Sequence, residues 1–144
     1  MFDIIYCFDG KFWMQAAASI NSLLKSKSPD TVYSIHCAVP RGTAGRRKIE
    51  SLVRRTNCRL IWKELKNKEN PFRNFDHRLW SPVIFYRLFA HRIFPNLQTV
   101  LYLDCDTMIN HDLTELFNTE FQGFAVAAVE DLADEKNPIN LFGK

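Results

Sequence analysis

Residues 2–24 read FDIIYCFDGKFWMQAAASINSLL, and this stretch decides the fold class. Its first part, residues 3–8, is a short apolar run typical of a buried strand. The part that follows carries apolar residues at helical spacing: Phe12, Ala16, Ile20, Leu23 and Leu24. Ser28 and Pro29 end this helical pattern. A strand that leads directly into a helix is the first step of a β–α–β unit, so the stretch predicts an α/β domain.

The same alternation continues along the chain. We expect a strand over residues 32–39, a helix over roughly 44–56 and a third strand over 60–62. Strands that alternate with helices indicate a mostly parallel, Rossmann-like sheet flanked by helices. The whole chain of 144 residues fits one such domain.

The second half of the chain predicts further elements of the same kind. Residues 64–80 are polar with scattered aromatics, which indicates a long loop that packs over another part of the protein. Ser81 and Pro82 are a good N-cap and first turn for a helix that ends at Pro95. Apolar residues occur on nearly every side of this helix, so we expect it to be buried. The remaining expectations are a strand over 99–103, a short helix over 113–117 capped by Asp112, and a buried strand over 124–129.

The charge is unevenly distributed. The net charge is +3, yet residues 41–68 hold ten Lys or Arg and only two Asp or Glu. The cations flank Ile49, Leu52 and Val53 at helical spacing, which favours a solvated helix face over a surface that binds an anionic polymer or lipid. We expect no nucleic-acid partner.

The cysteines and the N-terminus indicate the compartment. Cys7, Cys37, Cys58 and Cys105 form no CxxC pair, so we expect reduced thiols. Asp3 interrupts the first apolar run, and no basic segment precedes it, unlike in a signal peptide. We therefore expect a cytoplasmic protein. Peripheral contact with the inner membrane is the alternative.

Carboxylates follow two of the predicted strands. Asp104 and Asp106 come directly after the strand over 99–103, and Asp9 follows the first strand. Parallel sheets bind ligands beyond the carboxyl ends of their strands, so the three side chains are expected at one crevice. Asp104 and Asp106 project to the same side and suit Mg²⁺ or Mn²⁺, while Cys105 faces the other way. A surface turn of capping aspartates is the alternative.

Three further residues have two interpretations each. Arg87 lies in an apolar helix, where it either pairs with an anion such as the strand-end aspartates or reaches the surface. Phe12 is either a ring that stacks on a base or the first core residue of the helix. Asp9 either reads a base edge or caps the helix. From the residues alone, the core and capping interpretations are favoured for Phe12 and Asp9.

Residues 2–24, together with residues 86–109 (YRLFAHRIFPNLQTVLYLDCDTMI), resemble glycosyltransferase family 8, whose members are retaining, metal-dependent enzymes of the GT-A fold. The resemblance implies transfer of a hexose from UDP-galactose or UDP-glucose to a saccharide such as the lipopolysaccharide core. Carried over by position, Asp9 binds uracil and Phe12 takes the place of a stacking tyrosine. The catalytic Arg87 reaches the donor sugar, Asp104 contacts the UDP-sugar, and Asp104 with Asp106 binds Mn²⁺ or Mg²⁺.

The sequence also departs from the family pattern. Gly10 and Lys11 stand where many relatives have an acidic and a small polar residue. The family's acceptor-binding half and its late metal-binding histidine have no counterpart. None of the four histidines matches that metal-binding histidine: His36, His77, His91 and His111. We therefore expect a GT-A domain that is incomplete at its C-terminus and prone to form a homodimer through exposed apolar surface.

Two other classes of protein compete with this hypothesis. A haloacid-dehalogenase-like phosphatase would use Asp104 as its nucleophile, but Thr107 follows Asp106 one position too early for that pattern. A non-catalytic module would bind an anion through residues 41–68.

Overall fold

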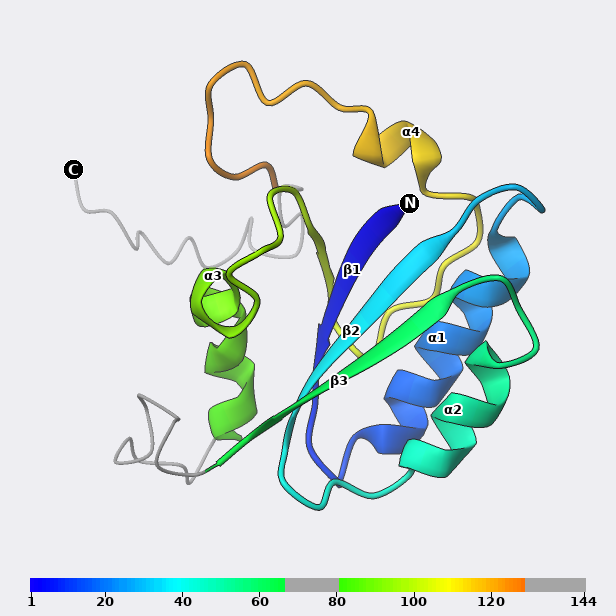
Figure 1. The fold of residues 1–144 in the computed structure, drawn as a ribbon, viewed down its shortest axis with the longest axis vertical. Coiled ribbons are helices and arrows are strands. Elements are labelled where there is room, and N and C mark those ends of the chain that lie inside the picture. Colours follow the sequence, from blue (N-terminus) through cyan, green and yellow to red (C-terminus); the bar gives the residue numbers. More distant parts are fainter. Residues whose placement is uncertain (67–80, 129–144) are drawn as a thin grey trace, which may run out of the picture.

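The computed structural model describes residues 1–66 and 81–128, which form a parallel sheet with helices on both faces (Figure 1). The strands are β1 (Phe2–Cys7), β2 (Tyr33–Pro40), β3 (Arg59–Leu65) and β4 (Leu101–Leu103). The helices are α1 (Trp13–Ser26), α2 (Arg46–Val53), the 3₁₀ helix η2 (Pro82–Phe89), α3 (Ala90–Ile93) and α4 (Thr114–Phe117). The strand order β3-β2-β1-β4 confirms the predicted α/β class.

The register of the sheet brings the ends of β1 and β4 together. β1 lies in the interior of the sheet, between β2 and β4. All three strand pairings are parallel. Ile4 lies opposite Leu101, and Tyr6 lies opposite Leu103. Because both strands run in the same direction, Asp9 and Asp104 follow their strands at the same edge of the sheet, where such folds bind ligands.

The main core lies between the sheet and the helices α1 and α2. It is built from alternate residues of the strands and from the apolar stripe of α1, and its fully buried members include Ile4, Tyr6, Ile20, Leu23 and Ile35. The turn into α2 packs closely on α1, since a Cβ on Gly45 would overlap the ring of Trp13. Gly45 also has a φ of +80°, which glycine adopts without strain.

A row of serines on α1 binds the chain that leaves β4. The Ser22 hydroxyl accepts a hydrogen bond from the backbone N–H of Ile109 at 2.9 Å, and the Ser26 hydroxyl donates to the Ile109 carbonyl at 2.6 Å. Ser19 contacts the Thr107 hydroxyl at 3.2 Å. These serines are spaced along one face of α1, so the helix holds the segment after Asp106 in place.

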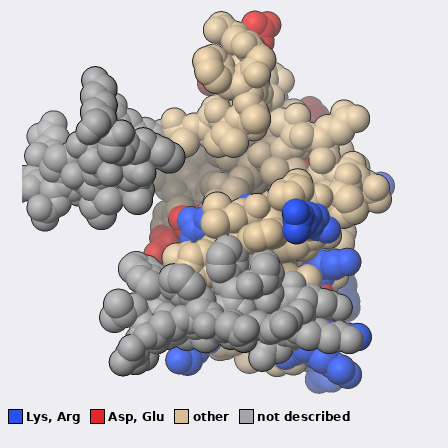
Figure 2. Space-filling view, turned by 90° about the vertical axis from the view of Figure 1, so that its left-hand side faces the viewer, with Lys and Arg blue, Asp and Glu red and all other residues tan. Residues whose placement is uncertain are grey.

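η2 and α3 cover the opposite face of the sheet. Val83, Tyr86, Ile93 and Phe94 are buried there against strand residues that include Ile5. Seen from this side, the described surface is mostly uncharged in its upper part, and Lys and Arg gather in its lower half (Figure 2). η2 runs from the carboxyl ends of the strands, so it passes close to the predicted site (Figure 1).

Two expectations for the second half of the chain were wrong. The helix predicted after Ser81 is a 3₁₀ segment followed by a short α-helix, and it is buried on one side only, since Leu88 is 61% exposed. No strand forms over residues 124–128, where Phe124 and Val126 are 74% and 76% exposed. Those residues have no neighbouring strand in the described structure to complete their backbone hydrogen bonds. Residue 129 and most of the loop predicted over 64–80 lie outside the described residues.

Part of the basic segment forms the outer face of α2, as the solvated-face interpretation predicted, while Arg59 and Lys63 lie on β3. Arg47, Lys48 and Arg54 are exposed, whereas Ile49 and Val53 are buried beneath them. All four cysteines have free thiols. Within residues 1–66 and 81–128, no helix has the length and apolar character needed to cross a bilayer.

Candidate active site

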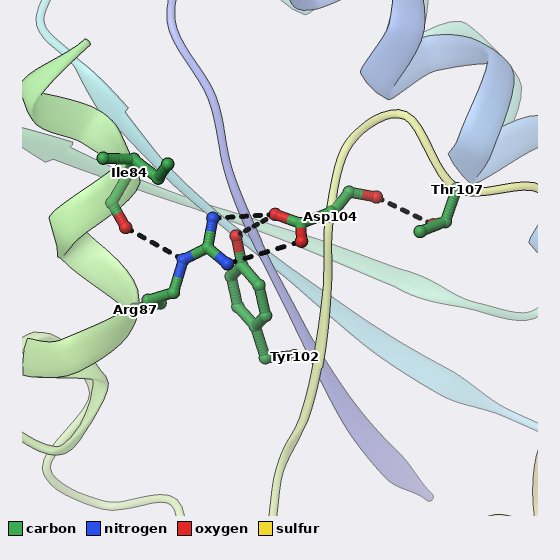
Figure 3. A network of polar contacts seen from close by, with 5 residues as sticks. All are labelled: Ile84, Arg87, Tyr102, Asp104 and Thr107. Atoms are coloured by element: carbon green, nitrogen blue, oxygen red, sulfur yellow. Dashed lines mark hydrogen bonds and ion pairs between the residues drawn. The ribbon is translucent and has the colours of Figure 1, made fainter. Parts of the chain in front are cut away.

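The guanidinium of Arg87 meets the carboxylate of Asp104 with both of its terminal nitrogens. Arg87 Nη2 donates to Asp104 Oδ1 at 2.8 Å, and Nη1 donates to Oδ2 at 3.3 Å (Figure 3). Arg87 Nε donates to the carbonyl of Ile84 at 2.9 Å, one turn earlier in η2. The third contact orients the planar guanidinium toward β4, so the pair has the two-point geometry that arginine forms with carboxylates.

Tyr102 contacts both members of this pair. Its hydroxyl donates to Asp104 Oδ1 at 2.7 Å, and its ring lies 4.6 Å from the Arg87 guanidinium carbon in a cation–π contact (Figure 3). Tyr102 and Asp104 are two residues apart on an extended segment, which places both side chains on the face of the sheet that η2 covers. Asp104 therefore has a donor from its own strand as well as from the helix.

The backbone of Asp104 is fixed from the opposite face. Its carbonyl accepts hydrogen bonds from the Thr107 hydroxyl at 2.7 Å and from the Thr107 N–H at 3.2 Å. The Thr107 hydroxyl contacts Ser19, and Ser19 in turn contacts the hydroxyl of Tyr6 at 3.1 Å. This chain of hydroxyl groups connects the turn after β4 to the buried core, so the direction in which Asp104 leaves its strand is well determined.

Asp9 is bound to the other end of η2. Its Oδ2 accepts a hydrogen bond from the Ser81 hydroxyl at 2.7 Å, and its Oδ1 accepts one from the Lys11 N–H at 2.8 Å. Ser81 is the N-cap of η2. The carboxylate thus caps the turn before α1 rather than α1 itself, whose N-cap is Phe12. One helix therefore contacts Asp9 through its first residues and Asp104 through Arg87.

Phe12 and Asp106 both present their side chains to solvent. Phe12 is 43% exposed, so its interpretation as a core residue was wrong. Asp106 is exposed as well, and it has no hydrogen-bond partner within the described ranges. Cys105, between the aspartates, packs against the main core as expected. Both exposed side chains are thus accessible to a ligand at the strand ends.

Two thiols near the strand ends are affected by the charged side chains of the candidate site. Burial raises the pKa of Cys105, and the charges of Asp106, Asp104 and Asp9 raise it further. Burial also raises the pKa of Cys7 to about 12, against the lowering effect of the Arg87 charge. Charged side chains that follow β1 and β4 therefore both influence the Cys105 thiol.

The residues fit a hard cation with few protein ligands. Asp104 and Asp106 offer carboxylate oxygens, which Mg²⁺ and Mn²⁺ prefer. In the described part of the chain, no group of three or more His, Cys, Asp or Glu could hold a metal ion. Two carboxylates leave most of an octahedral shell to water and to ligand oxygens, a composition that suits a cation bound together with a diphosphate.

Three residues of this arrangement were missed in the sequence. Tyr102, Thr107 and Ser81 each donate to one of the predicted aspartates. In the sequence pattern, Tyr102 is one more residue of an apolar strand, and Ser81 is a helix cap. The only signal available was the two-residue spacing of Tyr102 and Asp104, which places them on the same face of a strand.

The chain matches the family model described as glycosyl transferase family 8 over residues 3–142. It is 26% identical over 138 residues to a candidate glycosyltransferase of Haemophilus influenzae, covering 94% of this chain and 41% of that protein. The galactosyltransferase LgtC, solved with donor and acceptor sugar analogues, superposes with a TM-score of 0.70 at 20% identity, over 83% of this chain and 43% of that one.

The bifunctional glycosyltransferase WbbM has the same fold over this region. It superposes with a TM-score of 0.64 at 20% identity, covering 84% of this chain and 21% of that one. These neighbours confirm the predicted GT-A fold. The chain spans less than half the length of the relatives it matches.

Proposed function

This chain belongs to glycosyltransferase family 8, and from that premise we propose that it is the nucleotide-sugar-binding part of an enzyme that transfers a hexose from a UDP-sugar. The transfer retains the anomeric configuration and requires a divalent cation. The observation that carries the proposal is the Arg87–Asp104 pair, which lies at the carboxyl ends of β1 and β4. This is the edge at which open parallel sheets bind nucleotides.

Asp9 and Phe12 are proposed to bind the base. Each Asp9 oxygen already accepts one hydrogen bond, from Lys11 or Ser81, and a carboxylate oxygen can accept a second. Asp9 can therefore accept the N–H of a uracil without losing its present contacts. The exposed ring of Phe12 lies three residues further on and offers a surface for stacking.

Asp104 and Asp106 are proposed to hold Mn²⁺ or Mg²⁺ together with the donor diphosphate. The exposure of Asp106 and the absence of a hydrogen-bond partner for it in the described ranges support this role, because a carboxylate ligand must be available to the ion. A cation bound there would act as a Lewis acid that stabilises the negative charge of the leaving diphosphate.

Arg87 is proposed to contact the donor sugar or its phosphate. A guanidinium has five N–H donors. Arg87 uses three of them on Ile84 and Asp104, so two of its five donors have no partner among these contacts. Its side chain is 33% exposed. The guanidinium therefore combines a fixed orientation with free donors, which is what a positioned electrostatic contact to a transferring sugar requires.

The acceptor is proposed to be a saccharide, with the lipopolysaccharide core as the leading candidate and UDP-galactose or UDP-glucose as the donor. LgtC, which was solved with donor and acceptor sugar analogues, supports a sugar on both sides of the reaction. A cytoplasmic location, with peripheral membrane contact, agrees with such an acceptor.

The phosphatase alternative does not fit the position of Asp104. Its Oδ1 accepts two hydrogen bonds, from Arg87 and Tyr102, and its Oδ2 accepts a third. Charge-assisted hydrogen bonds of this kind withdraw electron density from a carboxylate and weaken it as a nucleophile. The family match also assigns the chain to a different class of enzyme.

Calorimetric titration of the chain with UDP, UDP-galactose and UDP-glucose, each with and without Mn²⁺, tests the proposal. We expect UDP to bind in a Mn²⁺-dependent manner and one of the two sugars to bind more tightly than the other. Nucleotide binding that is the same with Mn²⁺ and with a chelator would contradict the cation site, and no UDP binding under either condition would contradict the proposed function as a whole.

A further inference from the structure

The two oxygens of Asp104 are not equally available. A carboxylate oxygen has two lone pairs, directed roughly in the plane of the group. Oδ1 accepts short hydrogen bonds from the Tyr102 hydroxyl at 2.7 Å and from Arg87 Nη2 at 2.8 Å, so both of its acceptor positions are occupied. Among residues 1–66 and 81–128, the only donor to Oδ2 is Arg87 Nη1, at the longer distance of 3.3 Å. Oδ2 therefore has the remaining acceptor capacity.

The Tyr102 hydroxyl is held where it is by both the strand and the ring contact. Tyr102 lies within β4 and is paired with Ile5 of β1, so its backbone is part of the sheet. Its ring is half-buried and stacks on the Arg87 guanidinium. Asp104 cannot turn Oδ1 outward without breaking two short hydrogen bonds, both of which are charge-assisted because the carboxylate is ionised.

We propose that Tyr102 is a positioning residue that restricts Asp104 to coordinating a cation through Oδ2 alone, and that it thereby favours Mn²⁺ and Mg²⁺ over Ca²⁺. The inference rests on the cation site of the proposed function and adds a determinant of metal selectivity to it. Tyr102 does not touch the ion in this arrangement; it acts by occupying the second oxygen of a ligand.

The physical basis is the difference between these ions in their coordination. Mg²⁺ requires near-octahedral geometry with six ligands at short distances, a shell that one oxygen from each of two carboxylates enters without distortion. Ca²⁺ takes six to eight oxygens at longer distances and readily accepts both oxygens of one carboxylate. A donor that occupies Oδ1 removes the two-oxygen mode, which benefits Ca²⁺ most.

Tyr102→Phe is the variant that isolates this effect. It deletes the hydroxyl and keeps the ring that stacks on Arg87, so the Arg87–Asp104 pair is retained. Tyr33→Phe is the matched control, because the Tyr33 hydroxyl accepts a hydrogen bond from Leu113 N–H on the far side of the sheet. Both variants lose one tyrosine hydroxyl, but only one of those hydroxyls contacts Asp104.

The experiment measures Mn²⁺ binding to the chain in the presence of saturating UDP by electron paramagnetic resonance, with Ca²⁺ and Mg²⁺ as competitors. For Tyr102→Phe we expect Mn²⁺ affinity to fall by about tenfold, as is usual when an outer-shell partner of a ligand is removed. We expect Ca²⁺ affinity to fall less or to rise, so the ratio of Ca²⁺ to Mn²⁺ affinity increases. Tyr33→Phe should keep the wild-type ratio of Ca²⁺ to Mn²⁺ affinity. A variant that is merely less stable should keep this ratio as well.

Two results would overturn the inference, and they are distinguishable. An unchanged Ca²⁺ to Mn²⁺ ratio in Tyr102→Phe, with Mn²⁺ bound normally by the wild type, would refute the role of Tyr102 and leave the proposed function standing. Failure of the wild-type chain to bind Mn²⁺ with UDP would refute the cation site itself, and the role of Tyr102 with it. Circular dichroism of each variant verifies that it is folded.

Discussion

Arg87 and Asp104, seventeen residues apart in the chain, form a two-point ion pair between η2 and β4 with nitrogen–oxygen distances of 2.8 and 3.3 Å. The apolar sequence around Arg87 predicted a buried helix, but the pair is partly exposed. The side chain of Arg87 is 33% exposed and that of Asp104 is 48% exposed. Ion pairs that water reaches contribute little to stability. The importance of this pair is therefore geometric, because it connects the segment that carries Arg87 to the end of the strand that carries the aspartates.

Replacing Arg87 with methionine should impair ligand binding much more than folding. Because the pair is solvent-accessible, we expect the free energy of unfolding to fall by less than about 1 kcal/mol. The affinity for the UDP-sugar should fall relative to that for UDP, since the proposed contact is to the sugar. Calorimetry with both ligands and urea unfolding measure the two effects. Arg92→Met is the control, because Arg92 stacks on Phe89 in the same helical segment. Equal losses for UDP and UDP-sugar would argue against a contact to the sugar.

Replacing Asp106 with asparagine should remove most of the cation dependence of UDP binding. Asp106 has no hydrogen-bond partner in the described ranges, so the substitution should leave the fold unchanged. With Mn²⁺ present, we expect UDP affinity to fall by at least about tenfold, which is roughly 1.4 kcal/mol. Asp30→Asn, at an exposed turn, is the control. Identical titration curves for the wild type and Asp106→Asn in Mn²⁺ would show that Asp106 is not a ligand.

Replacing Gly45 with alanine should destabilise the protein more than the same change at Gly42. Both glycines have a positive φ, of +80° and +78°, so both substitutions introduce backbone strain of about 1–2 kcal/mol. Only at Gly45 does the new methyl group overlap another side chain, the ring of Trp13. Urea unfolding of the two variants isolates that overlap. Equal losses of stability would show that Trp13 moves aside at little cost.

Asp112 should make the stability of the protein sensitive to acid. Partial burial tends to raise the pKa of its carboxyl, but hydrogen bonds from Thr114, Ser28 and Thr31 outweigh it, and the pKa lies well below the ordinary value. The Thr114 N–H donates at 2.8 Å and the Ser28 N–H at 2.7 Å. A lowered folded-state pKa means that the ionised group stabilises the fold above about pH 4 and that this contribution is lost as the pH falls further.

The test compares the wild type with Asp112→Asn by urea unfolding between pH 7 and pH 3. We expect the variant to be less stable at pH 7 and the difference between the two proteins to shrink below about pH 4, where the unfolded wild type binds a proton. A difference that is constant over the whole range would mean that the ionised form of Asp112 is not the source of its stabilising effect.

Local sequence pattern was sufficient to predict most of the fold. The alternation of apolar runs with helical periodicity predicted β1, α1, β2, α2, β3 and β4 in order. In each of these elements apolar residues recur with the period of a strand or a helix. The same pattern was misleading at residues 124–128, which are apolar enough for a strand but exposed. A strand needs a neighbour for its backbone hydrogen bonds, and a local pattern does not reveal whether one is present.

The sequence by itself also determined where the candidate site lies, because Asp9, Asp104 and Asp106 follow apolar strands, and parallel strands end at one edge. Only the tertiary structure decided how the site is built. Ser81 reaches Asp9 across 72 residues, and Arg87 reaches Asp104 across 17. The face of η2 that meets each aspartate is set by how that helix packs on the sheet. Which oxygen of Asp104 stays available depends in turn on donors from two elements, and periodicity along a chain carries no information about such contacts.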